Sequence, residues 1–262
     1  MEPSDTAGGR SRATRWQLRG LSMALFLALW EVAGRSGDYL LFAPPSAVGG
    51  TMVDQLVVDR TLLWAVTDAL FQCVVGYGLA AAVGVPMGFL IGFWAPARDV
   101  LGPVVDALYA TPMVALAPLI VIWFGLDVAG KVLFVFAFAV FVVVVNTEAG
   151  VTETPEGYVD AARVFGVTDW RIYTEIHLRH ALPYVLTGLR LGAGRAVRGM
   201  VAAELFLFAG DLGSYLIDSG ATFQVERLLA AIATLSLLGV LAVGLVGAAE
   251  RRLRRSGGRA GV

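Results

Sequence analysis

Long apolar stretches alternate with short charged segments along most of the chain. Residues 228–249 and 69–97 carry no charged side chain, and residues 132–145 form a shorter unbroken apolar run. Because about 20 mainly apolar helical residues cross a bilayer core, the two long stretches predict membrane-spanning helices. The shorter run spans only when it is extended to about residue 149, with Lys131 snorkelling outward at its start.

The same pattern predicts six membrane helices, at about residues 20–36, 69–95, 100–124, 129–149, 184–209 and 228–249. The first resembles a signal-peptide core, but no convincing cleavage site follows it, so we expect an uncleaved helix. Strands are not expected, because an isolated strand in lipid leaves its backbone unsatisfied. The predicted fold class is therefore an all-α polytopic membrane protein. Residues 20–250 form the embedded domain, residues 1–19 and 251–262 are tails, and residues 150–183 are a loop.

The distribution of basic residues predicts the orientation of these helices. With the N-terminus in the cytoplasm, 13 basic residues fall on the cytoplasmic side and four on the outer side, leaving three within the fifth span. Short cytoplasmic loops carry an excess of Lys and Arg in membrane proteins. Both termini and the loop at 150–183 are therefore expected on the cytoplasmic side.

Composition supports lipid as the main solvent of the chain. Apolar residues make up 57% and charged residues 16%, with a mean hydropathy of +0.73, whereas soluble domains carry roughly 25% charged residues. The single cysteine, Cys73, cannot form an internal disulfide, and the net charge is −1. These values exclude a disulfide scaffold, a disordered chain and a nucleic-acid-binding protein.

The loop at 150–183 has the pattern of a short capped helix. Pro155 and Glu156 suit a first helical turn, and Gly166 suits the position just past a helix end. Asp160 and Arg163 share one face, and two alanines between them remove side-chain bulk. A short helix of this kind on the cytoplasmic side indicates a docking element.

These residues carry a family resemblance. Asp160-Ala161-Ala162, then Gly166, then Ile176-His177-Leu178 resembles the EAA loop of binding-protein-dependent ABC importer permeases. Further similar segments lie at residues 40–48, 111–125, 188–192 and 202–205. The similarity covers roughly residues 20–250 and is nearest to the nitrate, taurine and aliphatic-sulfonate branch. Two departures are Asp160 in place of the usual glutamate and Arg179 in place of the usual proline, which leaves Pro183 as the only proline at the start of the fifth helix.

The resemblance implies a transport subunit with no cofactor of its own. ATP and Mg²⁺ would be bound by two cytoplasmic ATPase subunits, and an external binding protein would deliver the solute to this chain and a second permease copy, in a bacterial plasma membrane. The implied ATPase-coupling residues are Asp160, Ala161, Ala162, Arg163, Gly166, Ile176 and Pro183. The expected solute is a sulfonate, taurine or nitrate-like anion, and the alternative is a thiamine precursor or another vitamin.

Polar residues inside the predicted spans are candidates for the translocation path, namely Glu204, Arg195, Arg198, Thr111 and Met113. A carboxylate in lipid costs on the order of 2.5–3.5 kcal/mol, so Glu204 should face either a cavity or a basic partner. The arginines at 190, 195 and 198 lie within about 140° of one another on a helical wheel. They indicate either a funnel that attracts anions or snorkelling toward lipid phosphates.

Other motifs favour structural roles. Residues 125–131 match most of a phosphate-binding loop, but Val132 replaces the magnesium-binding hydroxyl and no strand precedes the motif. Gly84, Gly88 and Gly92 share one helix face and predict close helix packing within the subunit. His177 and His180 do not form a metal-binding pattern, and no catalytic constellation is present. An autonomous secondary transporter or channel would show internal repeats or acidic relays, and neither is found.

Overall fold

The computed structural model describes residues 12–36, 42–207 and 212–257, and every regular element within these ranges is helical. In chain order the elements are α1 (Arg12–Ser36), α2 (Pro45–Val53), η1 (Asp54–Val58), α3 (Thr61–Phe93), α4 (Ala95–Ala110), η2 (Met113–Leu116), α5 (Ala117–Phe124), α6 (Val128–Thr152), α7 (Glu156–Val164), α8 (Asp169–Arg171), η3 (Ile172–His177), α9 (Leu178–Phe206), α10 (Leu212–Ala221) and α11 (Val225–Gly257). The all-α prediction is confirmed for these ranges.

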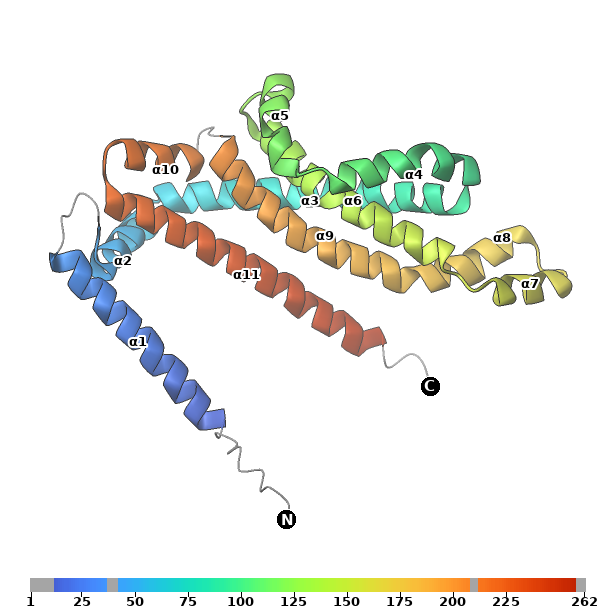
Figure 1. Cartoon of the computed structure of the whole chain (residues 1–262), viewed down its shortest axis with the longest axis horizontal. Helices are drawn as coiled ribbons and strands as arrows, with labels where there is room; N and C mark the ends of the chain where they lie inside the picture. The colour runs from blue at the N-terminus through green and yellow to red at the C-terminus, as the bar shows by residue number, and fades with distance from the viewer. Residues whose placement is uncertain (1–11, 37–41, 208–211, 258–262) are drawn as a thin grey trace, which may run out of the picture.

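The core of the molecule is a bundle in which α6 packs against both α3 and α9 (Figure 1). Val135, Val140 and Val144 of α6 are buried there with Ala80 of α3 and Met200 of α9. The β-branched run of α6 is helical because its backbone must pair internally in lipid, whatever its preference in water. This central helix therefore holds the other two in place.

Glycines bring α3 and α6 into close contact. A Cβ added at Gly84, Gly88 or Gly92 would lie 3.0, 2.5 or 2.7 Å from side-chain atoms of Val143, Thr147 and Val151 of α6. Real Cβ contacts below 3.0 Å are essentially never seen. Small residues at this spacing let membrane helices approach each other closely. The predicted packing within the subunit is confirmed.

The segment expected as one helix over residues 100–124 is divided in the structure. α4 ends at Ala110, and the pair η2–α5 continues after a bend of 96°. Thr111 is extended, with φ −69° and ψ 133°, because a residue before proline is disfavoured in the helical region. Pro86 and Pro103, by contrast, lie inside continuous helices.

Three helical segments of the described chain are long and apolar enough to cross a membrane. They are α3, α6 and the Val225–Ala242 part of α11, and the bent pair of α4 and η2–α5 would make a fourth. The more polar helices α1 and α9 are not among them. The structure thus supports a membrane protein by length and composition.

The bundle has two distinct ends. At one end, Phe93 of α3 contacts the loop that contains α7, α8 and η3. At the other end, α10 lies near the start of α3, and α2 packs against α11 through Ala43, Val48 and Ala230. The N-terminal part of α1 lies away from the bundle (Figure 1). Its C-terminal end meets the segment before α2, where Trp30 donates a hydrogen bond to the Ala43 carbonyl (3.1 Å).

Candidate functional site

The loop between α6 and α9 carries α7, a short helix whose residues are mostly exposed. Pro155 is extended and precedes its first residue, and Glu156 lies in its first turn, where a negative charge is favourable. α7 ends as predicted just before Gly166, whose φ is +72°. The Gly166 amide donates to the Arg163 carbonyl (2.9 Å) and the Val167 amide to the Ala162 carbonyl (3.0 Å), which is a Schellman-type helix end.

The outer face of α7 is open to solvent. Asp160 and Arg163 form an exposed ion pair at 4.0 Å, and such surface pairs contribute about 0–1 kcal/mol. Ala161 between them is exposed and Ala162 is half-buried. The two charges are therefore held loosely, and they remain available to another surface.

Exposed apolar side chains surround α7. Phe165 and Val164 are both 85% exposed, and Trp170 is 74% exposed. Within the same loop, Ile172 is only 2% exposed and Ile176 is half-buried. The apolar side chains of the loop thus fall into two groups: Ile172 and Ile176 anchor the loop, and Val164, Phe165 and Trp170 are exposed. Large exposed apolar side chains gathered in one loop are typical of an interaction site.

Aromatic contacts tie the loop to the end of α3. The Phe93 ring meets the ring of Tyr173 at 5.2 Å and that of His177 at 5.7 Å, in edge-on geometry. Partial burial lowers the pKa of His177, a hydrogen bond to the Val151 carbonyl opposes this shift, and the charges of Arg163 and His180 add to it. These ring contacts therefore join the loop to the end of α3.

The helix that follows the loop begins earlier than expected. α8, η3 and α9 follow one another without a break from Asp169, and η3 is a π-helical turn. Pro183, expected at the start of the fifth helix, lies inside α9 instead. The turn at 172–177 directly precedes α9, so the loop is continuous with a bundle helix.

A buried ion pair joins three helices at the opposite end of the bundle. Lys131 Nζ lies 3.0 Å from Glu204 Oε1, and the two side chains are 2% and 1% exposed. Glu204 Oε2 also accepts the backbone N–H of Gly213 at 3.1 Å. The sequence indicated that Glu204 faces either a cavity or a basic partner, and the structure shows the basic partner, Lys131. The expectation that Lys131 snorkels outward is wrong, because that carboxylate holds it inside.

The phosphate-loop-like motif is the connection between α5 and α6. Gly125, with φ +74°, follows the end of α5, and Lys131 lies in the first turn of α6. The Lys131 amine is engaged by Glu204. In the described fold the motif therefore connects α5 to α6, and its lysine is held by an ion pair.

Arg195 has a partner that sequence reasoning missed. Its Nη2 donates to the Tyr109 hydroxyl at 3.1 Å, and its guanidinium carbon lies 4.6 Å from the centre of that ring. The two residues are 86 positions apart, so no local pattern could have paired them. Tyr109 lies just before the bend at Thr111, whose hydroxyl donates to the Ala107 carbonyl (2.8 Å). The structure thus brings Arg195 near the bend that contains Thr111 and Met113.

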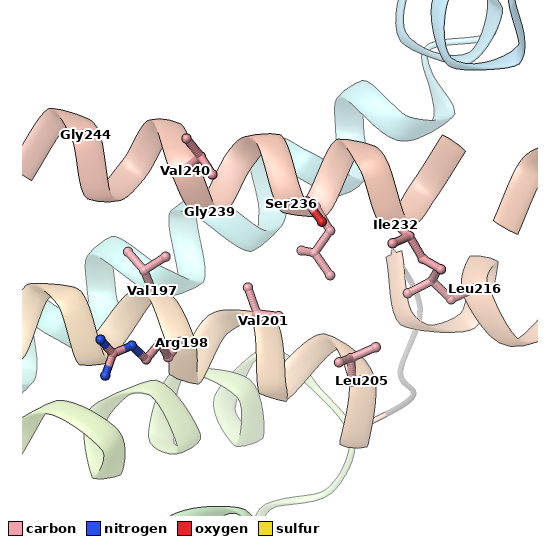
Figure 2. Close-up of a pocket in the computed structure, with 11 residues that line it drawn as sticks. Val197, Arg198, Val201, Leu205, Leu216, Ile232, Ser236, Gly239, Val240 and Gly244 are labelled. Carbon is pink, nitrogen blue, oxygen red and sulfur yellow. The ribbon is translucent and has the colours of Figure 1, made fainter. Parts of the chain in front are cut away.

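Arg198 lies apart from these residues. It lines a groove of about 860 Å³ between α9 and α11, with Leu216 of α10 at one end (Figure 2). Among the described residues that line this groove, Arg198 alone is charged. The predicted path residues therefore fall into three places: the buried pair at Glu204, the bend near Arg195, and this groove.

Comparison with known proteins places these features in a family. Residues 84–255 match the model of the binding-protein-dependent transport system inner membrane component. The chain is 28% identical to the taurine transport system permease protein of Escherichia coli, over 89% of this chain and 87% of that protein. It is also 28% identical to a Bacillus subtilis protein that carries the name of an aliphatic sulfonates transport permease, over 91% and 87%. Identity to the bicarbonate transport system permease protein of Synechococcus elongatus is 25%, over 92% of each.

Proposed function

Since the chain belongs to the family of binding-protein-dependent transport system inner membrane components, we propose that it is the membrane permease subunit of an ATP-driven importer. The chain would pair with a second permease copy and with two cytoplasmic ATPase subunits. An extracytoplasmic binding protein would deliver the solute. The expected location is a bacterial plasma membrane, crossed by six helices.

The course of α11 supports a cytoplasmic position for the end of that helix. α11 starts beside α10 and runs toward the end of the bundle that carries α7 (Figure 1). α1 begins away from the α2 end, which it reaches only at its C-terminal residues. The end of α11 and the loop therefore share one side, whereas the start of α1 lies apart from α7 in this view. That side is also the arginine-rich one, as the positive-inside rule requires for the cytoplasm.

The observation that carries the coupling role is the exposed apolar surface around α7. Phe165, Val164 and Trp170 have little reason to be exposed in water unless another protein covers them. Of the implied coupling residues, Asp160, Ala161, Ala162 and Arg163 lie on α7 and Gly166 lies just past its end, whereas Ile176 lies in η3 and Pro183 in α9. ATP binding would close the ATPase dimer and carry residues 157–176 inward, and the rings at Phe93 would pass that movement to α3.

A charge reversal on α7 tests this role. We expect Asp160→Arg to abolish co-purification of the full-length chain with its ATPase, because it adds a cation next to Arg163. Asp218→Arg, the same change at an exposed position of α10, is the matched control and should retain the ATPase. Equal recovery of the ATPase with wild type and Asp160→Arg would refute the docking assignment.

The solute class follows from the named relatives. Taurine, aliphatic sulfonates and bicarbonate appear in the names of similar permeases, so we propose a small anion of this kind. These names do not favour a thiamine precursor or another vitamin, and family membership does not favour an autonomous channel. The chain is proposed to bind no nucleotide, with ATP and Mg²⁺ held by the partner ATPase.

A further inference from the structure

One carboxylate, that of Glu204, joins three helices at the end of the bundle opposite α7. Its Oε1 lies 3.0 Å from Lys131 Nζ in the first turn of α6, and its Oε2 accepts the Gly213 N–H of α10 at 3.1 Å. The N–H groups of a first helical turn have no acceptor within their own helix, and negative charge is favourable beside them. Lys131 therefore fixes the direction of the carboxylate, and the carboxylate holds the start of α10.

The helices α6 and α9 pack closely from the loop to this carboxylate. Gly150 of α6 and Gly188 and Gly199 of α9 lie so near the other helix that an added Cβ would come within 2.6, 2.8 and 2.9 Å of its side-chain atoms. At the loop end, the Tyr184 hydroxyl also donates to Glu153 Oε2 at 2.6 Å. Close-packed interiors transmit displacement because they compress little. The two helices, which we call the α6–α9 pair, therefore extend as one unit from the loop to Glu204.

The helix α10 packs on a different part of the bundle. Its buried leucines lie in an apolar cluster with side chains of α3 and α11. Ala203 and Leu207, on either side of Glu204, instead pack with α5 and α6. Among the described residues of α9, the half-buried Val201 touches the α10 cluster. The hydrogen bond from Gly213 to Glu204 thus links the two clusters, and a displacement of the α6–α9 pair would act on α10 through it.

Stability alone does not account for a buried ion pair at this position. Apolar side chains of similar volume often hold a fold as well as such a pair, or better. What they cannot supply is an acceptor for the Gly213 N–H, and a buried N–H without an acceptor is costly. The pair therefore provides a directed contact to α10 that packing would not provide.

We infer that Glu204 is a positioning residue for transport, which joins α10 to the α6–α9 pair so that movement at α7 reaches the opposite end of the bundle. Lys131 assists it by orienting the carboxylate. When ATP binding moves the loop, the α6–α9 pair would move with it, and α10 would follow through Gly213. The inference rests on the proposed function, in which the ATPase moves α7, and it adds the residue that passes the movement on.

The test measures maleimide labelling of Asp218→Cys in the full-length chain, assembled with its ATPase in nanodiscs, with and without a non-hydrolysable ATP analogue. Asp218 is exposed on α10, and the single native cysteine, Cys73, is buried. We expect the analogue to change the labelling rate by about threefold or more, since labelling follows the population of accessible conformations. Arg179→Cys, at an exposed position of α9 beside the loop, should respond as well.

Two double variants isolate the contact to α10. The test variant combines Lys131→Met with Glu204→Leu, and its matched control combines Lys131→Met with Glu204→Gln. Neither variant leaves a buried charge, but only the glutamine offers an oxygen to the Gly213 N–H. We expect the response at position 218 to persist with glutamine and to vanish with leucine, while position 179 responds in both.

A second pair of variants decides the question if the leucine variant does not elute like wild type. Gly213→Pro removes the donor and leaves the ion pair in place, and proline is tolerated in the first turn of a helix. Gly213→Ala keeps the donor and is the matched control. The response at position 218 should vanish in Gly213→Pro and persist in Gly213→Ala. Equal responses within either pair of variants would overturn the inference.

The inference and the proposed function fail separately in this experiment. All these variants should still co-purify with the ATPase, because α10 lies far from α7 in the bundle (Figure 1). With wild-type Glu204 and Lys131, a response at position 179 without one at position 218 would overturn the inference and leave the proposed function standing. No response at either position would refute the proposed coupling to the ATPase.

Discussion

Removing one partner of the Lys131–Glu204 pair should destabilise the fold strongly, whereas removing both charges should not. The proposed variants are Lys131→Met, Glu204→Gln and the double substitution. In each single variant one charge stays buried in a site that is at most 2% exposed. In the double variant the amide oxygen at 204 can still accept the Gly213 N–H, and neither member of the pair is left as a buried charge.

The separation of the two charges sets the magnitude. At 3.0 Å, with an effective dielectric constant of about 20, their attraction is about 5.5 kcal/mol. Breaking one half of a buried pair costs about 3–5 kcal/mol, because the remaining charge is uncompensated, whereas neutralising both halves is often nearly neutral. We therefore expect each single variant to lose about 3–5 kcal/mol and the double variant to lose less than about 2 kcal/mol.

Unfolding of the purified chain in detergent micelles by sodium dodecyl sulfate measures these differences through tryptophan fluorescence. Arg35→Met is the matched control, because it breaks the Arg35–Glu31 ion pair, whose side chains are 66% and 25% exposed. Such a pair contributes at most about 1 kcal/mol. A double variant whose loss equals the sum of the two single losses would refute the reasoning, since independent sites add and coupled ones do not.

Three further outcomes are expected. Gly88→Ala should lower stability by about 1–3 kcal/mol, because its Cβ would lie 2.5 Å from Thr147, whereas Gly78→Ala, with no atom within 4 Å, should not; sodium dodecyl sulfate unfolding compares them. Gly166→Ala should speed hydrogen exchange at the end of α7, because a left-handed residue with a Cβ costs about 1–2 kcal/mol. The folded-state pKa of His177 lies below its ordinary value of 6.5, so the unfolded loop binds more protons. Loop stability is then complete above pH 6.5 and falls as the pH drops below it. The protection factors of the loop amides, which divide out the pH dependence of intrinsic exchange, should be lower at pH 5.5 than at pH 7.5 in wild type and equal in His177→Phe.

Local signals made much of the fold readable from sequence. The ends of α7 follow from Pro155 and Gly166, whose backbone preferences act within a few residues. The face formed by Gly84, Gly88 and Gly92 indicated a helix contact because spacing by four repeats on one side of a helix. The Val-rich run of α6 could have been a strand or a helix in water. In lipid it could only be helical, because an isolated strand leaves its backbone groups unpaired.

Long-range pairs were beyond the reach of the same reasoning. Lys131 at a helix start is typical of a snorkelling residue, and only its contact with a residue 73 positions away shows that it is buried. The bend at Pro112 could not be distinguished from the tolerated prolines at 86 and 103, because neighbouring helices decide whether freed backbone groups are satisfied. The groove at Arg198 required the placement of α11 against α9.

Cross-linking of α7 to the ATPase in the assembled transporter tests the central claim most directly. A cysteine at Ala161, which is exposed on α7, would be paired with cysteines placed on the ATPase surface, and Thr222→Cys at the opposite end of the bundle would be the control. The account predicts cross-links from position 161 that change in yield when ATP binds, and none from position 222. Cross-links from position 222 but not from position 161 would contradict it.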